Sequence, residues 1–284
     1  MRLHPPRLLA LVLAAASVSA ALGASPAAAD PCPDGTLRCV DRTIGTMQDT
    51  FDTLAATCDH NAVFALSYWR TTQAYAVANA TPGWFDDPAW VNREDWYFGQ
   101  LWLGARTAWL QGKRSQVPQA WQIAFAAADS EQVSGAGDLL LGMNAHVNRD
   151  LPFALEAMGV VAPDGSSRKH DHDAINPMLA GVMPSILAES AARLDPTIPA
   201  ALINLLPLTD LTFFQLLALW REGAWQNAVR LVNATTAAQH AQVAASIEQS
   251  AATEAALIRT TFSYLPLLGG AAQRDAYCAA HAMP

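Results

Sequence analysis

A histidine and an aspartate four residues apart, His146 and Asp150, stand inside a strongly apolar run from Leu139 to Pro152. On a helix, residues four apart share one face, so these two side chains can act together. Burying an imidazole and a carboxylate costs free energy unless each is paired, so the spacing predicts a metal ion, a ligand or an ion pair. Because Pro152 cannot donate to the carbonyl of Asn148, we also expect a kink beside the pair.

A second polar cluster contains His170, Asp171, His172 and Asp173. Histidine and aspartate at this density are typical of metal ligands. The same residues also fit the start of a helix, where Asp171 or Asp173 would cap backbone N–H groups and the histidines would be solvated. On this segment alone, the capped helix is the favoured interpretation.

Together the two clusters suggest zinc, which takes three or four protein ligands and in catalytic sites leaves one position to an activated water. His146 and Asp150 supply two ligands, and the shell would be completed from Asp95, His170, Asp171 and His172. Arg149 or Arg221 would then bind an anionic group. The hypothesis is a metal-dependent hydrolase of a phosphoester or lipid-like ester, in which His146, Asp150 and an arginine carry the reaction.

Three other interpretations stay open. The pair could be an ordinary His–Asp or Arg–Asp contact on a helix surface. The chain could be a non-catalytic exported protein whose polar residues grip a small molecule, or a lipid-binding protein with a cavity lined by Trp96, Trp102 and Trp109. G-x-S-x-G, Walker and Rossmann patterns are absent from the sequence, so those reaction classes lose support.

The elements that must position these residues are helices. Apolar residues recur at helical spacing along most of the chain and alternating strand patterns are nearly absent, which predicts an all-α, single-domain orthogonal bundle of about nine to ten helices. Pro118, Gly159 and Asp210 fit a helix start, a helix end and an N-cap. The expected helices span 40–57, 60–79, 88–111, 118–128, 138–158, 173–194, 197–206, 210–232, 236–263 and 270–281.

Two apolar features need separate interpretation. Seven tryptophans lie between Trp69 and Trp121, and at helical spacing they favour a core over an aromatic pocket. The stretch from Ile198 to Trp220 is long, but Pro207 and Asp210 interrupt it. Two buried helices are therefore expected there, and not a membrane span.

Residues 1–29 combine two arginines, an apolar run and a string of small residues, which predicts a cleaved secretory signal. The mature chain, 30–284, would then be one secreted domain without a transmembrane segment. Losing two arginines and no acid takes the net charge from −8 to −10. An acidic chain of this kind is not expected to bind nucleic acid. The hydrolase and ligand-binding hypotheses predict a small-molecule or lipid-like substrate as its partner.

The four cysteines, Cys32, Cys39, Cys58 and Cys278, all lie in the expected mature chain. An even number in an oxidising compartment favours two disulfides. Three pairings are open. One would close a short loop between Cys32 and Cys39 and tie Cys58 to the C-terminal segment through Cys278.

Several motifs together resemble one family, the mainly actinobacterial proteins grouped as domain of unknown function 5995. The resemblance covers most of the mature chain and rests on Phe64, Tyr68 and Thr72, on Phe85-x-Asp87, Asp95, Phe98 and Trp102, on Val117-Pro-x-Ala-Trp121, on Gly142-Met-Asn-Ala-His146-Val-Asn-x-Asp150-Leu-Pro152, and on Asp171, Asn176 and Trp220-Arg221-x-x-Ala-Trp225. It implies no established activity.

The His146 to Asp150 segment is also similar to one helix of the all-α zinc-dependent phospholipase C and S1/P1 nuclease group, which supplies a histidine and an aspartate to a metal cluster. The likeness implies that His170 could be a later ligand. The chain departs from that pattern at Asp30, Glu156 and Ala174, where the group has ligands. A mononuclear or dinuclear site is therefore expected in place of a trinuclear cluster.

Overall fold

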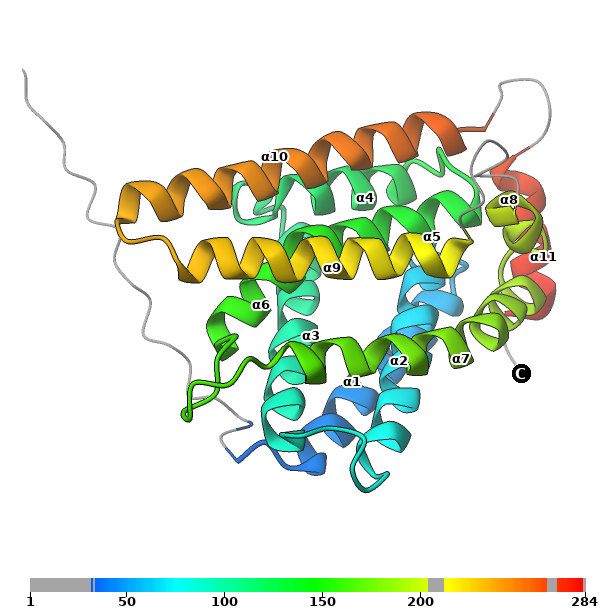
Figure 1. The fold of residues 1–284 in the computed structure, drawn as a ribbon. Helices are drawn as coiled ribbons and strands as arrows, with labels where there is room; N and C mark the ends of the chain where they lie inside the picture. The colour runs from blue at the N-terminus through cyan, green and yellow to red at the C-terminus, as the bar shows by residue number, and fades with distance from the viewer. Residues whose placement is uncertain (1–31, 33, 204–211, 265–269, 283–284) are drawn as a thin grey trace, which may run out of the picture. The chain divides into compact units, whose positions relative to one another are not determined.

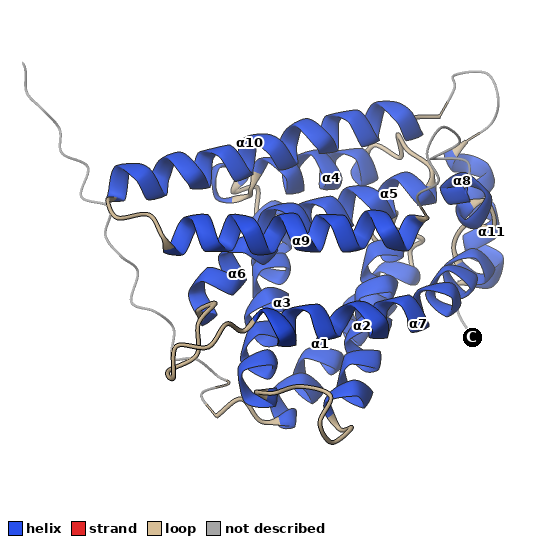
Figure 2. Ribbon diagram, viewed as in Figure 1, coloured by secondary structure: helices blue, strands red, loops and turns tan. Residues whose placement is uncertain are grey.

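Helices make up nearly all of the structure, a computed structural model that describes Cys32 and residues 34–203, 212–264 and 270–282 (Figures 1 and 2). No strand occurs in these ranges, where β-pairing is limited to two isolated bridges. The all-α prediction is confirmed. The helices are α1 (Leu37–Ala55), α2 (Ala62–Asn79), α3 (Pro88–Leu110), η1 (Arg114–Gln116), α4 (Gln119–Asp129), α5 (Gly135–Met143), η2 (Asn144–Asp150), α6 (Leu151–Met158), α7 (Lys169–Arg193), α8 (Ile198–Ile203), α9 (Phe213–Val232), α10 (Ala237–Phe262) and α11 (Ala271–His281).

Several helix boundaries follow from local chemistry. Asp87 begins α3 by accepting a hydrogen bond from the backbone N–H of Trp90, and Gly159 ends α6 at a positive φ of 78°. Helix α9 begins after Thr212, whose side chain forms a capping box with Gln215. The expected cap at Asp210 lies outside the described residues, as do Pro207 and the expected signal at 1–29.

The run that carries His146 forms one long helical segment, residues 135–158, made of α5, η2 and α6. Its middle part, η2, is π-helical, and the backbone N–H of Leu151 donates to the carbonyl of His146, five residues earlier. The irregularity expected at Pro152 therefore takes the form of a π-helical turn just before the proline. Such turns are often found at functional sites.

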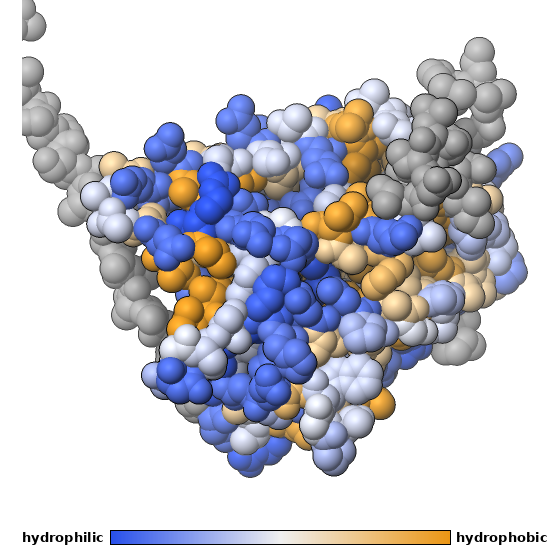
Figure 3. All heavy atoms as spheres, viewed as in Figure 1, coloured by the Kyte–Doolittle hydropathy of each residue, from blue (hydrophilic) through white to orange (hydrophobic). Residues whose placement is uncertain are grey.

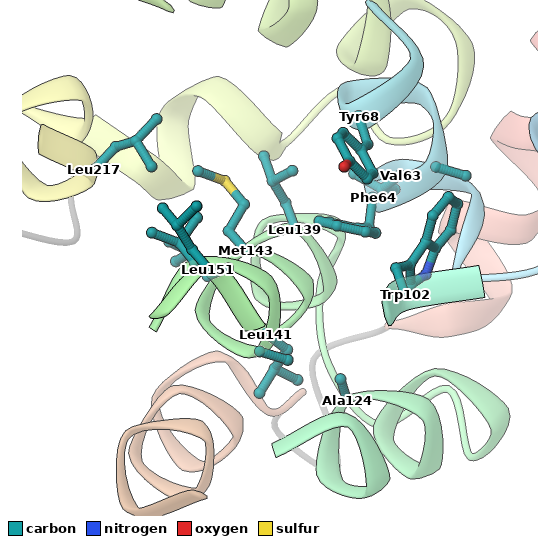
Figure 4. Close-up of a cluster of buried hydrophobic side chains, with 14 of the residues drawn as sticks. Val63, Phe64, Tyr68, Trp102, Ala124, Leu139, Leu141, Met143, Leu151 and Leu217 are labelled. Carbon is teal, nitrogen blue, oxygen red and sulfur yellow. The ribbon is translucent and has the colours of Figure 1, made fainter. Parts of the chain in front are cut away.

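The 135–158 segment lies in the middle of the bundle. Every residue of α5 is buried, and α5 contacts α2, α4, α8 and α10. Figure 4 shows Phe64 and Tyr68 reaching from α2 toward Leu139 and Met143. Trp90, Trp102 and Trp121 are among the largest fully buried side chains, so the interpretation of the tryptophans as core is confirmed for these three.

Close approach of α2 to this segment depends on a glycine. A Cβ atom built on Gly142 would lie 2.5 Å from ring carbons of Phe64, far inside van der Waals contact. The small residue therefore lets the ring of Phe64 lie directly against α5. From there it contacts Trp102 and Trp121 edge-on.

Two disulfides cross-link the chain, and they settle the pairing that the sequence left open. Cys32 pairs with Cys39, and Cys58 pairs with Cys278, joining the α1–α2 connection to α11 across 220 residues of sequence.

None of the helices in the described ranges combines the length and apolar character needed to cross a bilayer. On the face shown in Figure 3, hydrophilic side chains predominate and apolar ones gather in separate groups.

Candidate functional site

A cavity of about 100 Å³ lies between α2, α3, α7, α9 and the junction of α5 with η2. Most of its wall is apolar and includes three methionines, Met143, Met178 and Met183. A few polar side chains also border it: Ser67, Tyr68, Thr71, Tyr75, Glu94, Asp95, His146 and Arg221. An apolar hollow with a small polar group of residues is the usual form of a small-molecule site.

His146 enters this cavity from the π-helical turn. Its ring stacks on Phe98, with centroids 3.5 Å apart and planes at 7°, and meets the Tyr68 ring at 4.4 Å. Nδ1 lies 3.4 Å from Oδ2 of Asp150, whereas Nε2 is buried and has no hydrogen-bond partner among the described residues. Burial lowers the pKa of His146, opposed by the hydrogen bond to Asp150. The imidazole is therefore neutral near pH 7.

Asp150 is fully buried behind the imidazole, and nitrogen atoms surround its carboxylate. Trp121 donates from Nε1 to Oδ2 at 2.7 Å, and Arg149 donates to Oδ1 at 2.8 Å. The carboxylate oxygens accept these hydrogen bonds, and Oδ2 also faces Nδ1 of His146. The proton of the neutral His146 ring therefore lies on Nδ1, and the lone pair of Nε2 faces the cavity.

Two further polar atoms at the cavity lack partners in the described part of the chain: the hydroxyl of Tyr68 and Oδ2 of Asp95. Burial, with the nearby charge of Glu94, raises the pKa of Asp95 well above its ordinary value. Burial likewise raises the pKa of Tyr68, with Asp95 as the next cause. These upward shifts favour the protonated form of each group, and in that form each can donate an O–H hydrogen bond into the cavity.

Helix α9 contributes Arg221, the one cation that borders the cavity among the described residues. Its guanidinium donates from Nε to the Asn176 side chain at 2.8 Å and from a terminal nitrogen to the carbonyl of His172 at 2.6 Å. Burial lowers the pKa of Arg221 to about 10, so it remains charged. Burial raises the pKa of the neighbouring Glu94 to about 7, opposed by the charge of Arg221.

His172 lies behind this arginine and does not border the cavity. Nε2 of its ring donates to the carbonyl of Arg221 at 3.1 Å, and the ring lies 5.2 Å from that of Trp225. Burial and the charge of Arg221 lower the pKa of His172 well below its ordinary value. It is therefore a neutral residue that holds α7 against α9.

A separate group of metal-type ligands lies at the start of α7. Asp86, His170 and Asp171 bring their ligand atoms within 4.8 Å of one another, and in the described ranges no other three His, Cys, Asp or Glu residues do so. Asp86 and His170 are exposed, whereas Asp171 is buried and accepts hydrogen bonds from the backbone N–H groups of Asp86 and Asp87. This group could hold a metal ion.

A family model described as a family of unknown function, DUF5995, matches residues 40–261 of the chain. The chain belongs to this family. No curated protein and no solved structure matches it. The DUF5995 range includes every residue that borders the cavity, together with Trp121 and Asp150 behind His146.

The DUF5995 fold brings together some of the residues singled out by sequence and separates others. His146, Asp95 and Arg221 border one cavity, and Asp150 lies behind His146. Arg149 does not border it, because its guanidinium lies between Asp150 and Glu248. His170 and Asp171 form their group with Asp86, and His146 and Asp150 take part in no such group among the described residues.

Two further outcomes concern aromatic residues. Among the described residues, Phe and Tyr side chains border the cavity of this DUF5995 protein and no tryptophan does. Of Trp96, Trp102 and Trp109, which the lipid-binding alternative placed around a cavity, Trp102 borders a separate, smaller hollow with Phe64 and Trp121. Sequence reasoning also missed the roles of Tyr68 and Trp121. A signal for Tyr68 was available, since Tyr68, Thr71 and Thr72 place hydroxyl groups on one face of an apolar helix. The indole donor of Trp121 gave no such signal, because tryptophan at that position reads as core.

Proposed function

We propose that this DUF5995 protein binds a small, largely apolar molecule that carries a neutral hydrogen-bonding group. One observation carries the proposal: Nε2 of His146, Oδ2 of Asp95 and the hydroxyl of Tyr68 are buried without partners, among the described residues, around one apolar cavity. Each unpaired buried polar group costs about 1–3 kcal/mol. A ligand that offers one donor and one acceptor would remove much of that cost.

The chemistry of the wall supports a neutral ligand. Asp95 and Glu94 stand at the polar end, and the pKa of each is raised, which means that additional negative charge there is unfavourable. Arg221 is already held by Asn176 and by the carbonyl of His172. The three methionines supply a deformable apolar surface that suits an alkyl chain or ring.

We propose that the protein acts outside the cell. Two disulfides are compatible with an oxidising compartment, and residues 1–29 have the composition of a secretory signal. Mass spectrometry of the protein recovered from culture medium tests this proposal. An N-terminus near Asp30 is expected, and an intact N-terminus retained with the cells would contradict it.

Binding can be tested with 2-octanone and octanoate as probes that differ in charge. A ligand that binds only the folded state raises the melting temperature, so 2-octanone should raise it and octanoate should raise it less. Leu217→Phe fills the cavity from α9 and should abolish the effect. Leu219→Phe is the matched control, because Leu219 lies on the same helix but is 56% exposed. Equal shifts in both variants would refute the proposal.

A second candidate is a metal-dependent hydrolase of a phosphoester or lipid-like ester, with zinc as the ion expected from the ligand types. The group of Asp86, His170 and Asp171 is the observation that favours it. The similarity of the His146 helix to zinc phospholipases motivates the same candidate. It would place the metal at His146 and Asp150, whose carboxylate already accepts hydrogen bonds at both oxygens.

Metal analysis of untagged protein separates the two placements. Stoichiometric zinc that is lost in His170→Ala and retained in His146→Ala would place the ion at the start of α7. Zinc that is lost only in His146→Ala would place it in the cavity. Protein with far less than one equivalent of metal, unchanged in both variants, would refute this second candidate.

A further inference from the structure

We propose that the cavity is a metal-independent active site that hydrolyses a neutral carboxylic ester, with His146 as the general base that activates water. This inference rests on the proposed binding of a small apolar molecule and adds the reaction and the substrate class. It is carried by three features of the cavity: the direction of the His146–Asp150 pair, the unpaired Nε2, and the unpaired oxygen atoms of Tyr68 and Asp95 that border the same cavity.

The His146–Asp150 pair has the geometry of a base with its orienting carboxylate. Nδ1 faces Oδ2 of Asp150, which Trp121 holds from its other side, and stacking on Phe98 fixes the plane of the imidazole ring. The lone pair of Nε2 therefore points into the cavity in a defined direction. A carboxylate behind a histidine sets its tautomer and stabilises the imidazolium that forms when the base accepts a proton.

The unpaired Nε2 also indicates what the base acts on. Within the described ranges, no serine, threonine or cysteine side chain is hydrogen-bonded to Nε2 of His146, and all four cysteines are in disulfides. A nucleophile of the Ser–His type needs that contact. The proton that His146 removes must then come from a molecule that enters the cavity, and for hydrolysis that molecule is water.

Asp95 and Tyr68 supply the electrophilic side of the reaction. The hydroxyl of Tyr68 and Oδ2 of Asp95 border the same cavity and have no partners elsewhere in the described structure, and a proton on Asp95 would make both of them donors. Two O–H donors can bind the carbonyl oxygen of an ester and strengthen as negative charge develops on it. A carboxylic acid kept neutral by an apolar site can serve as such a donor.

The charges select an ester of a carboxylic acid over a phosphodiester. A phosphodiester needs a free cation, and Arg221, the one cation bordering the cavity among the described residues, already interacts with Glu94, with the Asn176 side chain and with the carbonyl of His172. A neutral ester adds no charge before the reaction starts. Its alkyl part matches the methionine-rich wall.

The reaction is balanced with water as the only co-reactant. His146 takes a proton from water through Nε2 while the water oxygen forms a bond to the carbonyl carbon, and the carbonyl oxygen becomes an oxyanion held by Asp95 and Tyr68. The oxyanion then collapses, the bond to the alkoxy oxygen breaks, and the imidazolium returns its proton to the leaving alcohol. The products are a carboxylic acid and an alcohol, and His146 is restored.

The test uses hydrolysis of p-nitrophenyl butyrate by the full mature chain in the presence of EDTA. Loss of a general base lowers rates by about 10²–10⁴-fold, so kcat/KM should fall by at least 100-fold in His146→Ala. His240→Ala is the matched control, since His240 also pairs with a carboxylate, Glu156, but lies on the half-exposed surface outside the cavity. It should keep the activity of the parent protein.

Folding is checked by the melting temperature and by binding of 2-octanone to each variant. Asp150→Asn should retain part of the rate and shift its pH profile, because Asp150 positions the base without touching substrate. Binding of 2-octanone without His146-dependent hydrolysis would refute this inference and leave the binding function standing. Absence of both would refute the binding function too, and activity abolished by EDTA would overturn the metal-independent mechanism.

Discussion

The indole of Trp121 should stabilise the fold mainly by holding Asp150, and Trp121→Phe tests this directly. Its Nε1 donates to Oδ2 of Asp150 at 2.7 Å, where the carboxylate is fully buried. A hydrogen bond to a charged group contributes about 1.5–3 kcal/mol, and its loss leaves part of a buried charge without a partner. Phenylalanine keeps an aromatic ring stacked on Phe125, so most of the packing remains.

We therefore expect a loss of about 2–3 kcal/mol in the free energy of unfolding and a fall in melting temperature of about 4–10 °C. Urea denaturation followed by far-UV circular dichroism measures the first, and the slope against urea should not change. Trp109→Phe is the matched control, because Nε1 of Trp109 donates to Asp129 at 2.8 Å on the exposed surface. The Trp109→Phe substitution should lower the free energy of unfolding by less than about 1 kcal/mol. Equal losses in the two variants would refute the role given to Trp121.

Three further predictions concern other parts of the molecule. The folded-state pKa of Asp95 lies above its unfolded value of 3.8, so above about pH 4 the folded protein holds a proton that the unfolded chain has lost. The free energy of unfolding should therefore fall as pH rises above about 4. Between pH 4 and 8 the melting temperature should fall less steeply in Asp95→Asn than in the parent protein, and parallel curves would contradict this. Gly142→Ala should lower the free energy of unfolding by about 1–3 kcal/mol, because the added Cβ meets the ring of Phe64. An unchanged midpoint in chemical denaturation would show that α2 can move aside. Replacing Cys58 and Cys278 together by alanine should lower the free energy of unfolding by about 5 kcal/mol, and replacing Cys32 and Cys39 should lower it by about 2 kcal/mol. The first disulfide closes the far longer loop, 220 residues against 7. A larger loss for Cys32 and Cys39 in urea denaturation would refute the loop argument.

The sequence predicts the positions of the helices because these depend on local patterns of apolar and polar residues. Each of the ten expected segments overlaps a described helix, with 138–158 seen as α5, η2 and α6, whereas the short helix η1 was not expected. Residues 204–206 and 210–211 of the expected segments lie outside the described residues. Starts and ends shifted by a few residues, most clearly at α7, which begins at Lys169 and not at residue 173. The sequence also located an irregularity near Pro152. It could not show that the irregularity is a π-helical turn, since that depends on how the segment packs against α9 and α10.

In the candidate site, too, local patterns predicted some features and tertiary packing determined the others. Spacing alone placed His146 and Asp150 on one helical face, four residues apart, and composition alone gave the all-α class. The partners of these residues come from distant parts of the chain: Trp121 from α4, Tyr68 from α2 and Asp95 from α3. Contacts of this range depend on the tertiary packing of several helices, which no local pattern encodes. Only the fold separated His170 and Asp171 from His146, and only burial in that fold turned a pair of possible metal ligands into an oriented imidazole facing an apolar cavity.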